Sequence, residues 1–183
     1  MEIDFNRSQN LIVGATGSGK TTFTKKIIKR HKFTFGIIAT STPWEYSTIK
    51  NAAVIEFKDL DSYTDMLFKA STKIPKYVII DNFIGIYKLN ATVEKLFTQG
   101  RHFNIATFLL TQYAAKCPPV VRENARYIWV FRSCVKTYEL IFNNQNKYAK
   151  KQDFVKFMQS KTGYSPILIN NADLSLRDNI LVL

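Results

Sequence analysis

Cysteines and acidic residues are scarce in this 183-residue sequence, which also has no long uninterrupted apolar run. The two cysteines, Cys117 and Cys134, match no metal-ligand spacing, which argues against a zinc site and against a disulfide-stabilised fold. No segment approaches the roughly 18 consecutive apolar residues of a membrane span, and the opening MEIDFNRSQN lacks the basic and apolar regions of a signal peptide. We therefore expect a soluble, intracellular protein with two reduced thiols.

Negative charge is the scarcer sign: 14 aspartates and glutamates stand against 26 lysines and arginines, which gives a net charge of +12. Such an excess implies a polyanionic partner, with nucleic acid the first candidate. A basic surface that only keeps the protein in solution is the alternative that charge alone leaves open. The composition, 46% hydrophobic and 14% aromatic, is typical of a globular protein, and we expect residues 1–183 to form a single domain.

Apolar runs alternate with helix-like segments along the chain, and this alternation predicts a mainly parallel α/β sheet with helices on both faces. Several of the runs are apolar throughout, as is typical of strands that are covered on both sides. The expected strands are residues 11–14, 34–40, 52–57, 77–81, 105–111, 126–132 and 166–170. The expected helices are residues 20–31, 61–71, 92–101, 118–125, 136–146 and 152–161.

The segment GATGSGKT, residues 14–21, fits the phosphate-binding P-loop (Walker A) pattern G-x-x-x-x-G-K-[ST] between an expected strand and an expected helix. Its glycines let backbone N–H groups turn toward a β-phosphate at a helix N-terminus, where the helix dipole favours anions. Lys20 supplies positive charge to the β- and γ-phosphates, and the Thr21 hydroxyl is a ligand for Mg²⁺. The residues expected to bind the nucleotide are Gly14, Thr16, Gly17, Ser18, Gly19, Lys20, Thr21 and Thr22.

Two polar residues follow later apolar strands. Asp81 comes directly after YVII, a Walker B position suited to hold Mg²⁺ through water. Gln112 comes directly after IATFLLT, where a glutamine can orient water or report the presence of the γ-phosphate. ATP and Mg²⁺ are therefore the expected cofactors, with Thr21 and Asp81 as the metal-binding residues.

Three classes of P-loop protein compete for this pattern. A GTPase needs an N-K-x-D guanine reader, and the nearest string, NKYA at residues 146–149, has no aspartate. A small kinase suits the length, but no arginine-rich lid follows Asp81; it remains the alternative enzyme. An ATP-driven motor is predicted by the extra strand that follows the metal-binding strand and ends at Gln112.

The segments YVIIDN, GRHFNIATFLLTQ and PPVVRENARYIWVF together resemble the FtsK–HerA superfamily, most closely its viral branch of poxvirus-type genome-packaging ATPases. The shared pattern, within residues 8–133, is an arginine, an apolar strand closing in Thr-Gln, then a proline-bearing segment with a second arginine and another strand. The resemblance implies a RecA-like (ASCE) P-loop ATPase that forms a pentameric or hexameric ring and pumps double-stranded DNA into a preformed capsid. It also implies action inside the host cell during virion assembly, contact with a capsid or vertex protein, and retention at a virion vertex as one outcome.

The catalytic base departs from this family pattern. The family usually has an acid directly after the metal-binding aspartate, and here that residue is Asn82, whose amide cannot accept a proton at neutral pH. Glu45, in ATSTPWEYS after the second expected strand, is one substitute, because in RecA-like motors the base can come from that strand's end. A water-positioning role for Asn82, or both roles for Asp81, are the alternatives, and Asn82 also leaves open an ATP-dependent DNA-binding or capsid-vertex protein without hydrolysis.

Arg101 precedes the Thr-Gln strand at the position of the superfamily's arginine, so the resemblance implies that it is an arginine finger reaching a neighbouring subunit's γ-phosphate. Arg122 and Arg126 are weaker alternatives, and we expect His102 to pack or cap locally. For DNA, the segment FIGIYKLNAT offers Lys88 to phosphates and Tyr87 to stack or wedge, contacts without base-sequence information.

Overall fold

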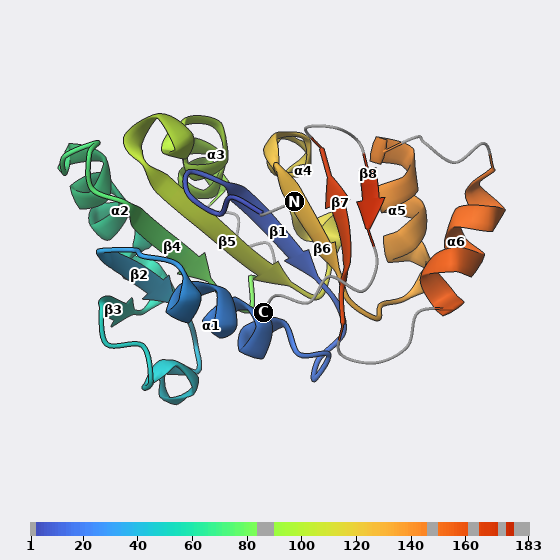
Figure 1. Ribbon diagram of the computed structural model, residues 1–183, viewed down its shortest axis with the longest axis horizontal. Helices are drawn as coiled ribbons and strands as arrows, with labels where there is room; N and C mark the ends of the chain where they lie inside the picture. The colour runs from blue at the N-terminus through green and yellow to red at the C-terminus, as the bar shows by residue number, and fades with distance from the viewer. Residues whose placement is uncertain (1–2, 84–89, 146–149, 161–164, 172–174, 178–183) are drawn as a thin grey trace.

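The computed structural model describes residues 3–83, 90–145, 150–160, 165–171 and 175–177. Within these residues, eight strands form one sheet in the order β3-β2-β4-β5-β1-β6-β7-β8 (Figure 1). The first six strands in this order run parallel, and β7 and β8 are added antiparallel. The strands are β1 (Gln9–Val13), β2 (Phe35–Ala39), β3 (Ala52–Ile55), β4 (Lys76–Ile80), β5 (Ile105–Thr111), β6 (Tyr127–Val130), β7 (Ile167–Asn170) and β8 (Ser175–Arg177).

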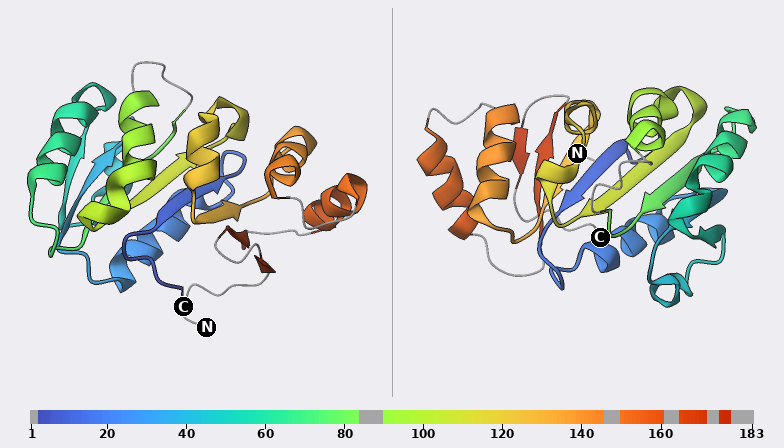
Figure 2. Two further views of the ribbon diagram at one scale, coloured as in Figure 1. Left: turned by 90° about the horizontal axis from the view of Figure 1, so that it is seen from above. Right: turned by 180° about the vertical axis from the view of Figure 1, so that it is seen from behind.

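Helices cover both faces of the sheet (Figure 2). One face carries α1 (Lys20–Arg30), whose apolar side packs with Phe5 and the aromatic residues of β6. The other face carries α2 (Leu60–Lys69), α3 (Asn90–Gln99) and α4 (Pro119–Asn124). The α5 (Val135–Gln145) and α6 (Lys151–Ser160) helices pack against each other beside the β6–β8 end of the sheet. The α/β class with a mainly parallel sheet and helices on both faces is therefore confirmed.

The seven expected strands and six expected helices are all present, with ends displaced by a few residues. One expected strand and one expected helix end too late, because in the structure a short 3₁₀ helix follows each of them. The strand expected to reach residue 57 ends at Ile55, since Phe57 already begins a 3₁₀ helix. The helix expected over 92–101 ends at Gln99, and Arg101 belongs to the 3₁₀ helix η4 (Gly100–Phe103). The three-residue β8 was not expected, because its sequence, SLR, has no apolar run.

Two buried polar contacts and one close approach fix the centre of the sheet. The Asn10 side chain of β1, fully buried, donates from Nδ2 to the Thr107 carbonyl of β5 (3.2 Å) and accepts at Oδ1 from Trp129 Nε1 of β6 (3.3 Å). Further along the sheet, a Cβ on Gly36 of β2 would lie 2.4 Å from the Tyr77 ring of β4. The two Asn10 contacts connect β1 to β5 and β6, which both come much later in the chain.

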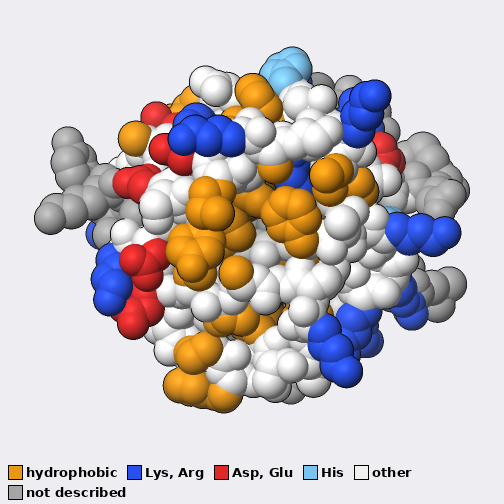
Figure 3. All heavy atoms as spheres, turned by 90° about the vertical axis from the view of Figure 1, so that its left-hand side faces the viewer, with side chains coloured by type: hydrophobic (Ala, Val, Ile, Leu, Met, Phe, Trp, Pro, Cys, Tyr) orange, Lys and Arg blue, Asp and Glu red, His pale blue; other side chains and the backbone are white. Residues whose placement is uncertain are grey.

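Apolar side chains gather on the molecular face at the β3 edge of the sheet (Figure 3). Trp44 is 70% exposed and Val54 38%, and both line a groove of about 630 Å³ together with Phe57. Exposed apolar patches of this kind frequently mark contact surfaces. None of the helices in the described segments is both long and apolar enough to traverse a bilayer.

Candidate nucleotide-binding site

The loop between β1 and α1 requires glycine at three positions. Gly17 and Gly19 have φ angles of 71° and 98°, in the left-handed region that side chains rarely adopt. A Cβ on Gly14 would lie 2.5 Å from Phe131 Cβ and 2.7 Å from Ser18 Oγ. The loop therefore folds tightly at the N-terminus of α1, where the helix dipole favours an anion. The N–H groups of Gly14, Ala15 and Ser18 donate to carbonyl oxygens and hold the loop in this shape.

Lys20, the first residue of α1, is only 7% exposed, and its ammonium group lies against the loop. Its Nζ donates to the carbonyl oxygens of Gly14 and Ala15, both at 2.9 Å. Burial lowers the pKa of Lys20, and the nearby Asp81 carboxylate acts in the opposite direction. The first turn of α1 has no acidic residue. Lys20 and the helix dipole therefore both produce a positive potential in the cleft beside the loop.

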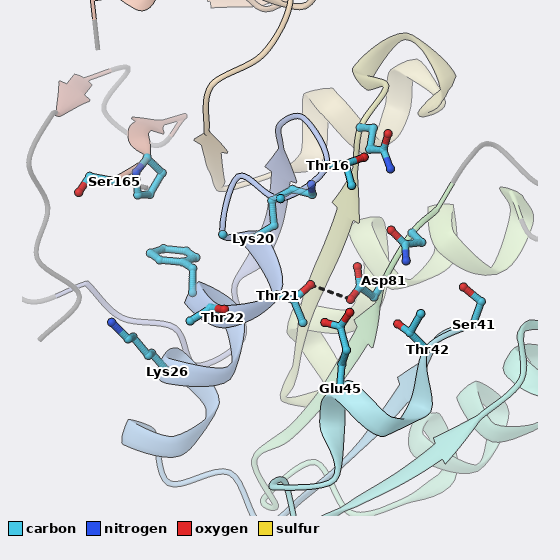
Figure 4. Close-up of a pocket in the computed structure, with 16 residues that line it drawn as sticks. Thr16, Lys20, Thr21, Thr22, Lys26, Ser41, Thr42, Glu45, Asp81 and Ser165 are labelled. Atoms are coloured by element: carbon cyan, nitrogen blue, oxygen red, sulfur yellow. Dashed lines mark hydrogen bonds between the residues drawn. The ribbon is translucent and has the colours of Figure 1, made fainter. Parts of the chain in front are cut away.

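That cleft lies at the carboxyl ends of the parallel strands and encloses about 800 Å³ (Figure 4). Parallel strands bring the residues that follow them to one edge, so the ends of β1, β2, β4 and β5 converge here. Six of the eight residues expected to bind nucleotide line the cleft, whereas Gly14 and Ser18 do not and instead shape the loop. Its lining is Thr16, Gly17, Gly19, Lys20, Thr21, Thr22, Phe23, Lys26, Ser41, Thr42, Glu45, Asp81, Asn82, Gln112, Ser165 and Pro166.

Asp81, directly after β4, accepts two hydrogen bonds at one carboxylate oxygen. Thr21 Oγ1 donates to Asp81 Oδ2 at 3.0 Å, and Tyr46 Oη donates to the same oxygen at 2.7 Å. Asp81 is 2% exposed and Tyr46 is fully buried. Burial, and then the Asp81 charge, raise the pKa of the Tyr46 phenol, so it stays a proton donor. Tyr46 was not among the expected site residues; its only signal was its place next to Glu45.

Glu45 and Asn82 line the same cleft from different strand ends. Glu45 belongs to the 3₁₀ helix η1 (Pro43–Tyr46) after β2, and its carboxylate points toward the Thr21–Asp81 pair (Figure 4). Asn82 has a φ angle of 62°, a left-handed conformation that asparagine adopts more readily than most residues. Gln112 reaches the cleft from the end of β5.

The arginines considered as fingers lie away from this lining. Arg101 is exposed at the amino end of β5, and its Nε contacts His102 Nε2 at 3.4 Å. Arg122 donates to the carbonyl oxygens of Ala114 and Cys117. Arg126 lies 5.3 Å from the Tyr127 ring centroid. The expected DNA-contacting residues, Lys88 and Tyr87, fall outside the described residues.

The mainly parallel sheet, the glycine loop with its lysine, and the aspartate at the end of an adjacent strand define a RecA-like P-loop ATPase. A family model described as "Poxvirus A32 protein" matches residues 4–173. The chain therefore belongs to the poxvirus A32 protein family, and the resemblance to the poxvirus-type branch is confirmed.

Two curated viral proteins are similar to this chain. Protein 075L of Invertebrate iridescent virus 6 is 26% identical over 94% of this chain and 72% of its own length. Protein 015R of Frog virus 3 is 23% identical over 75% of this chain and 48% of its own length.

Among solved structures, the genome packaging NTPase B204 of Sulfolobus turreted icosahedral virus 2, in complex with ATPγS, superposes with a TM-score of 0.71 at 20% identity, covering 97% of this chain and 100% of that one. EssC of Geobacillus thermodenitrificans shares the fold with a TM-score of 0.65 at 10% identity, over 91% of this chain and 38% of its own.

Proposed function

We propose that this protein is an ATP-hydrolysing translocase that moves double-stranded DNA into a preformed viral capsid. The observation that carries the proposal is the convergence of Lys20, Thr21, Asp81 and Gln112 on one cleft in a chain of the poxvirus A32 family. B204, which has the same fold, is described as a genome packaging NTPase. We further propose that residues 1–183 act as one ATPase domain.

The cleft fits Mg²⁺ as well as a nucleotide. Thr21 Oγ1 and Asp81 Oδ2 lie 3.0 Å apart on its wall, and oxygen donors of this kind are what Mg²⁺ prefers. In the described part of the chain no cluster of three His, Cys, Asp or Glu residues could hold a metal by itself, which suits an ion that takes further ligands from phosphates and water. When bound, Mg²⁺ neutralises charge that develops on the phosphates.

In this proposal Glu45, rather than Asp81, is the general base, and the contacts in the cleft support that choice. The Asp81 Oδ2 atom already accepts from Thr21 and Tyr46, and the Asn82 amide cannot take a proton. The Glu45 carboxylate points toward Thr21 and Asp81 from across the cleft (Figure 4). In the proposed reaction Gln112 orients the attacking water, Glu45 accepts its proton, and Lys20 stabilises charge on the transferred phosphoryl group.

The proposal includes assembly and DNA contact. With a net charge of +12 the chain suits a polyanion. A phosphate contact by Lys88 and stacking or wedging by Tyr87 carry no base-sequence information, which suits a motor that moves any duplex. We propose a pentameric or hexameric ring in which Arg101 serves the neighbouring subunit, and the exposed apolar residues at the β3 edge support self-association. The ring would act inside the host cell, docked to a capsid or vertex protein.

Phosphate release from ATP, measured with and without duplex DNA, tests this function. We expect Mg²⁺-dependent hydrolysis that DNA stimulates, and a fall in kcat of roughly 10²- to 10⁴-fold in Glu45→Gln, with residual turnover that can still be measured. Transfer of phosphate to a small acceptor without a response to DNA would identify a kinase instead. Tight ATP binding with no release in any condition would support the non-hydrolysing DNA-binding or vertex protein that Asn82 leaves open.

A further inference from the structure

Tyr46 is a buried donor in a short segment that also presents Glu45. The segment is η1, only four residues long, and it connects to the end of β2. Its last residue turns inward: the Tyr46 ring is fully buried among core aromatics and its hydroxyl reaches Asp81 Oδ2 at 2.7 Å. The residue before it turns outward into the nucleotide cleft. One hydrogen bond therefore joins the segment that follows β2 to the carboxylate that follows β4.

Apart from the packing of the Tyr46 ring, which a phenylalanine would keep, the side-chain contacts of η1 are weaker restraints on its position. The Lys25 ammonium donates to the Glu45 carbonyl oxygen at 2.8 Å, but this contact is exposed to solvent. The same ammonium lies 5.9 Å from the Tyr46 ring centroid, at the outer limit of a cation–π contact. A buried hydrogen bond to a carboxylate is stronger than either, because water cannot replace it.

We propose that Tyr46 is a positioning residue for ATP hydrolysis. It holds Asp81 and Glu45 at a fixed separation, so that the base faces the water beside the γ-phosphate. This inference rests on the proposed function, since it acts through Glu45 as the base. Small displacements of a catalytic group cost large factors in rate, so the Tyr46 hydroxyl affects turnover rather than nucleotide affinity.

The Tyr46→Phe variant removes the hydroxyl and keeps the ring. We expect its kcat to fall by roughly 10- to 100-fold, with the KM for ATP changed by less than about threefold. Tyr77→Phe is the matched control, because Tyr77 is also a buried tyrosine whose hydroxyl donates to a side chain, Asn51 Oδ1 at 3.3 Å, outside the cleft. We expect this control to keep its kcat.

A double-mutant cycle separates positioning from a general loss of structure. If Tyr46 acts through Glu45, Tyr46→Phe causes no further loss of kcat in a Glu45→Gln background. A second cycle needs no activity: the melting temperatures of Tyr46→Phe, Asp81→Asn and the double variant, without metal or nucleotide, should be non-additive because the two side chains share one bond.

The outcomes distinguish this inference from the proposed function. Full kcat in Tyr46→Phe alongside a strongly impaired Glu45→Gln overturns the role of Tyr46 and leaves the function standing. Independent, multiplicative losses in the kinetic cycle, or additive melting temperatures, overturn it as well. A fully active Glu45→Gln overturns the assignment of the base, whatever Tyr46→Phe shows.

Discussion

Lys20 is the residue on which the phosphate site depends most directly. Its buried ammonium has two carbonyl oxygens as partners and lies at the N-terminus of α1, so it is positioned before any ligand arrives. In Lys20→Ala we expect hydrolysis to fall below detection and ATP affinity to weaken by roughly 10- to 100-fold, the equivalent of one lost charge-assisted hydrogen bond. Phosphate release and a fluorescent-nucleotide titration measure both effects. Lys29→Ala, an exposed lysine in the last turn of the same helix, is the control, and a Lys20→Ala variant as active as this control would refute the P-loop assignment.

The two cysteines should differ sharply in reactivity, although both are free. Burial raises the pKa of Cys117 to about 12, which leaves almost no thiolate at neutral pH. The contact with Thr137 Oγ1, at 3.5 Å, lowers the pKa of the exposed Cys134 thiol. At pH 8 we expect iodoacetamide to modify Cys134 within minutes and Cys117 only after unfolding, as followed by peptide mass spectrometry. Equal labelling of both in the native protein would show that the Cys117 region opens.

At this scale the sequence identifies most of the cleft but not its internal contacts. Lys20 and Thr21 follow from a local motif, and Asp81, Gln112 and Glu45 follow from their places at strand ends, which parallel pairing brings to one edge. Tyr46 could not be identified in this way. Its hydroxyl contacts Asp81 only because β2 lies beside β4. The order of strands in a sheet cannot be predicted from a local sequence pattern.

Among the elements, β2 and β4 pack closely against each other at Gly36. A methyl group there would lie 2.4 Å from the Tyr77 ring, which cannot move because it is fully buried and its hydroxyl is bonded to Asn51. We expect Gly36→Ala to lower the free energy of unfolding by about 1–3 kcal/mol through overpacking. Denaturant unfolding measures the change. Gly100→Ala is the control, because its new Cβ would lie no closer than 3.5 Å to a neighbour, and an equal loss in both variants would contradict the packing argument.

Element types were predictable where the apolar pattern is long, and unpredictable where it is short. β5, seven buried residues, was expected with both ends correct. β8, three residues ending in arginine, leaves no periodic signal, and the 3₁₀ helices at strand and helix ends depend on tertiary packing rather than on propensity. The reversal of direction at β7 likewise depends on how α5 and α6 return the chain.

For the whole molecule, the location of Arg101 separates two possible roles. It precedes β5, whereas the cleft lies beyond the other end of that seven-residue strand, roughly 23 Å away. It therefore does not serve its own subunit's cleft, which is consistent with a role in a neighbour. Arg101→Ala should keep its affinity for ATP while turnover falls by roughly 10³-fold, since a finger stabilises charge that develops in the transition state.

Mixing variants tests this role in trans. Arg101→Ala keeps an intact P-loop, and Lys20→Ala keeps an intact arginine finger. Interfaces that pair these two intact parts should therefore recover some of the hydrolysis that neither variant shows alone. An Arg101→Ala protein as active as the wild type, at concentrations where the wild type is assembled, would move the assignment to Arg122 or Arg126. Mixed assemblies that form but stay inactive would refute the role of Arg101 in trans.

Asn10 bears on how this protein is made as well as on how it is held together. Its side chain bonds to Thr107, 97 residues later, and to Trp129, 119 residues later. At a synthesis rate of roughly 5–20 residues per second, β1 leaves the ribosome many seconds before either neighbouring strand exists. The P-loop is thus translated well before the strands that flank β1, and it reaches its working shape only after them. A nascent chain halted before β6 carries the whole glycine motif but lacks Trp129, which bonds Asn10, and the Arg132 carbonyl, which accepts from the Ala15 N–H. We therefore expect nucleotide to stabilise only chains whose β6 has already been translated.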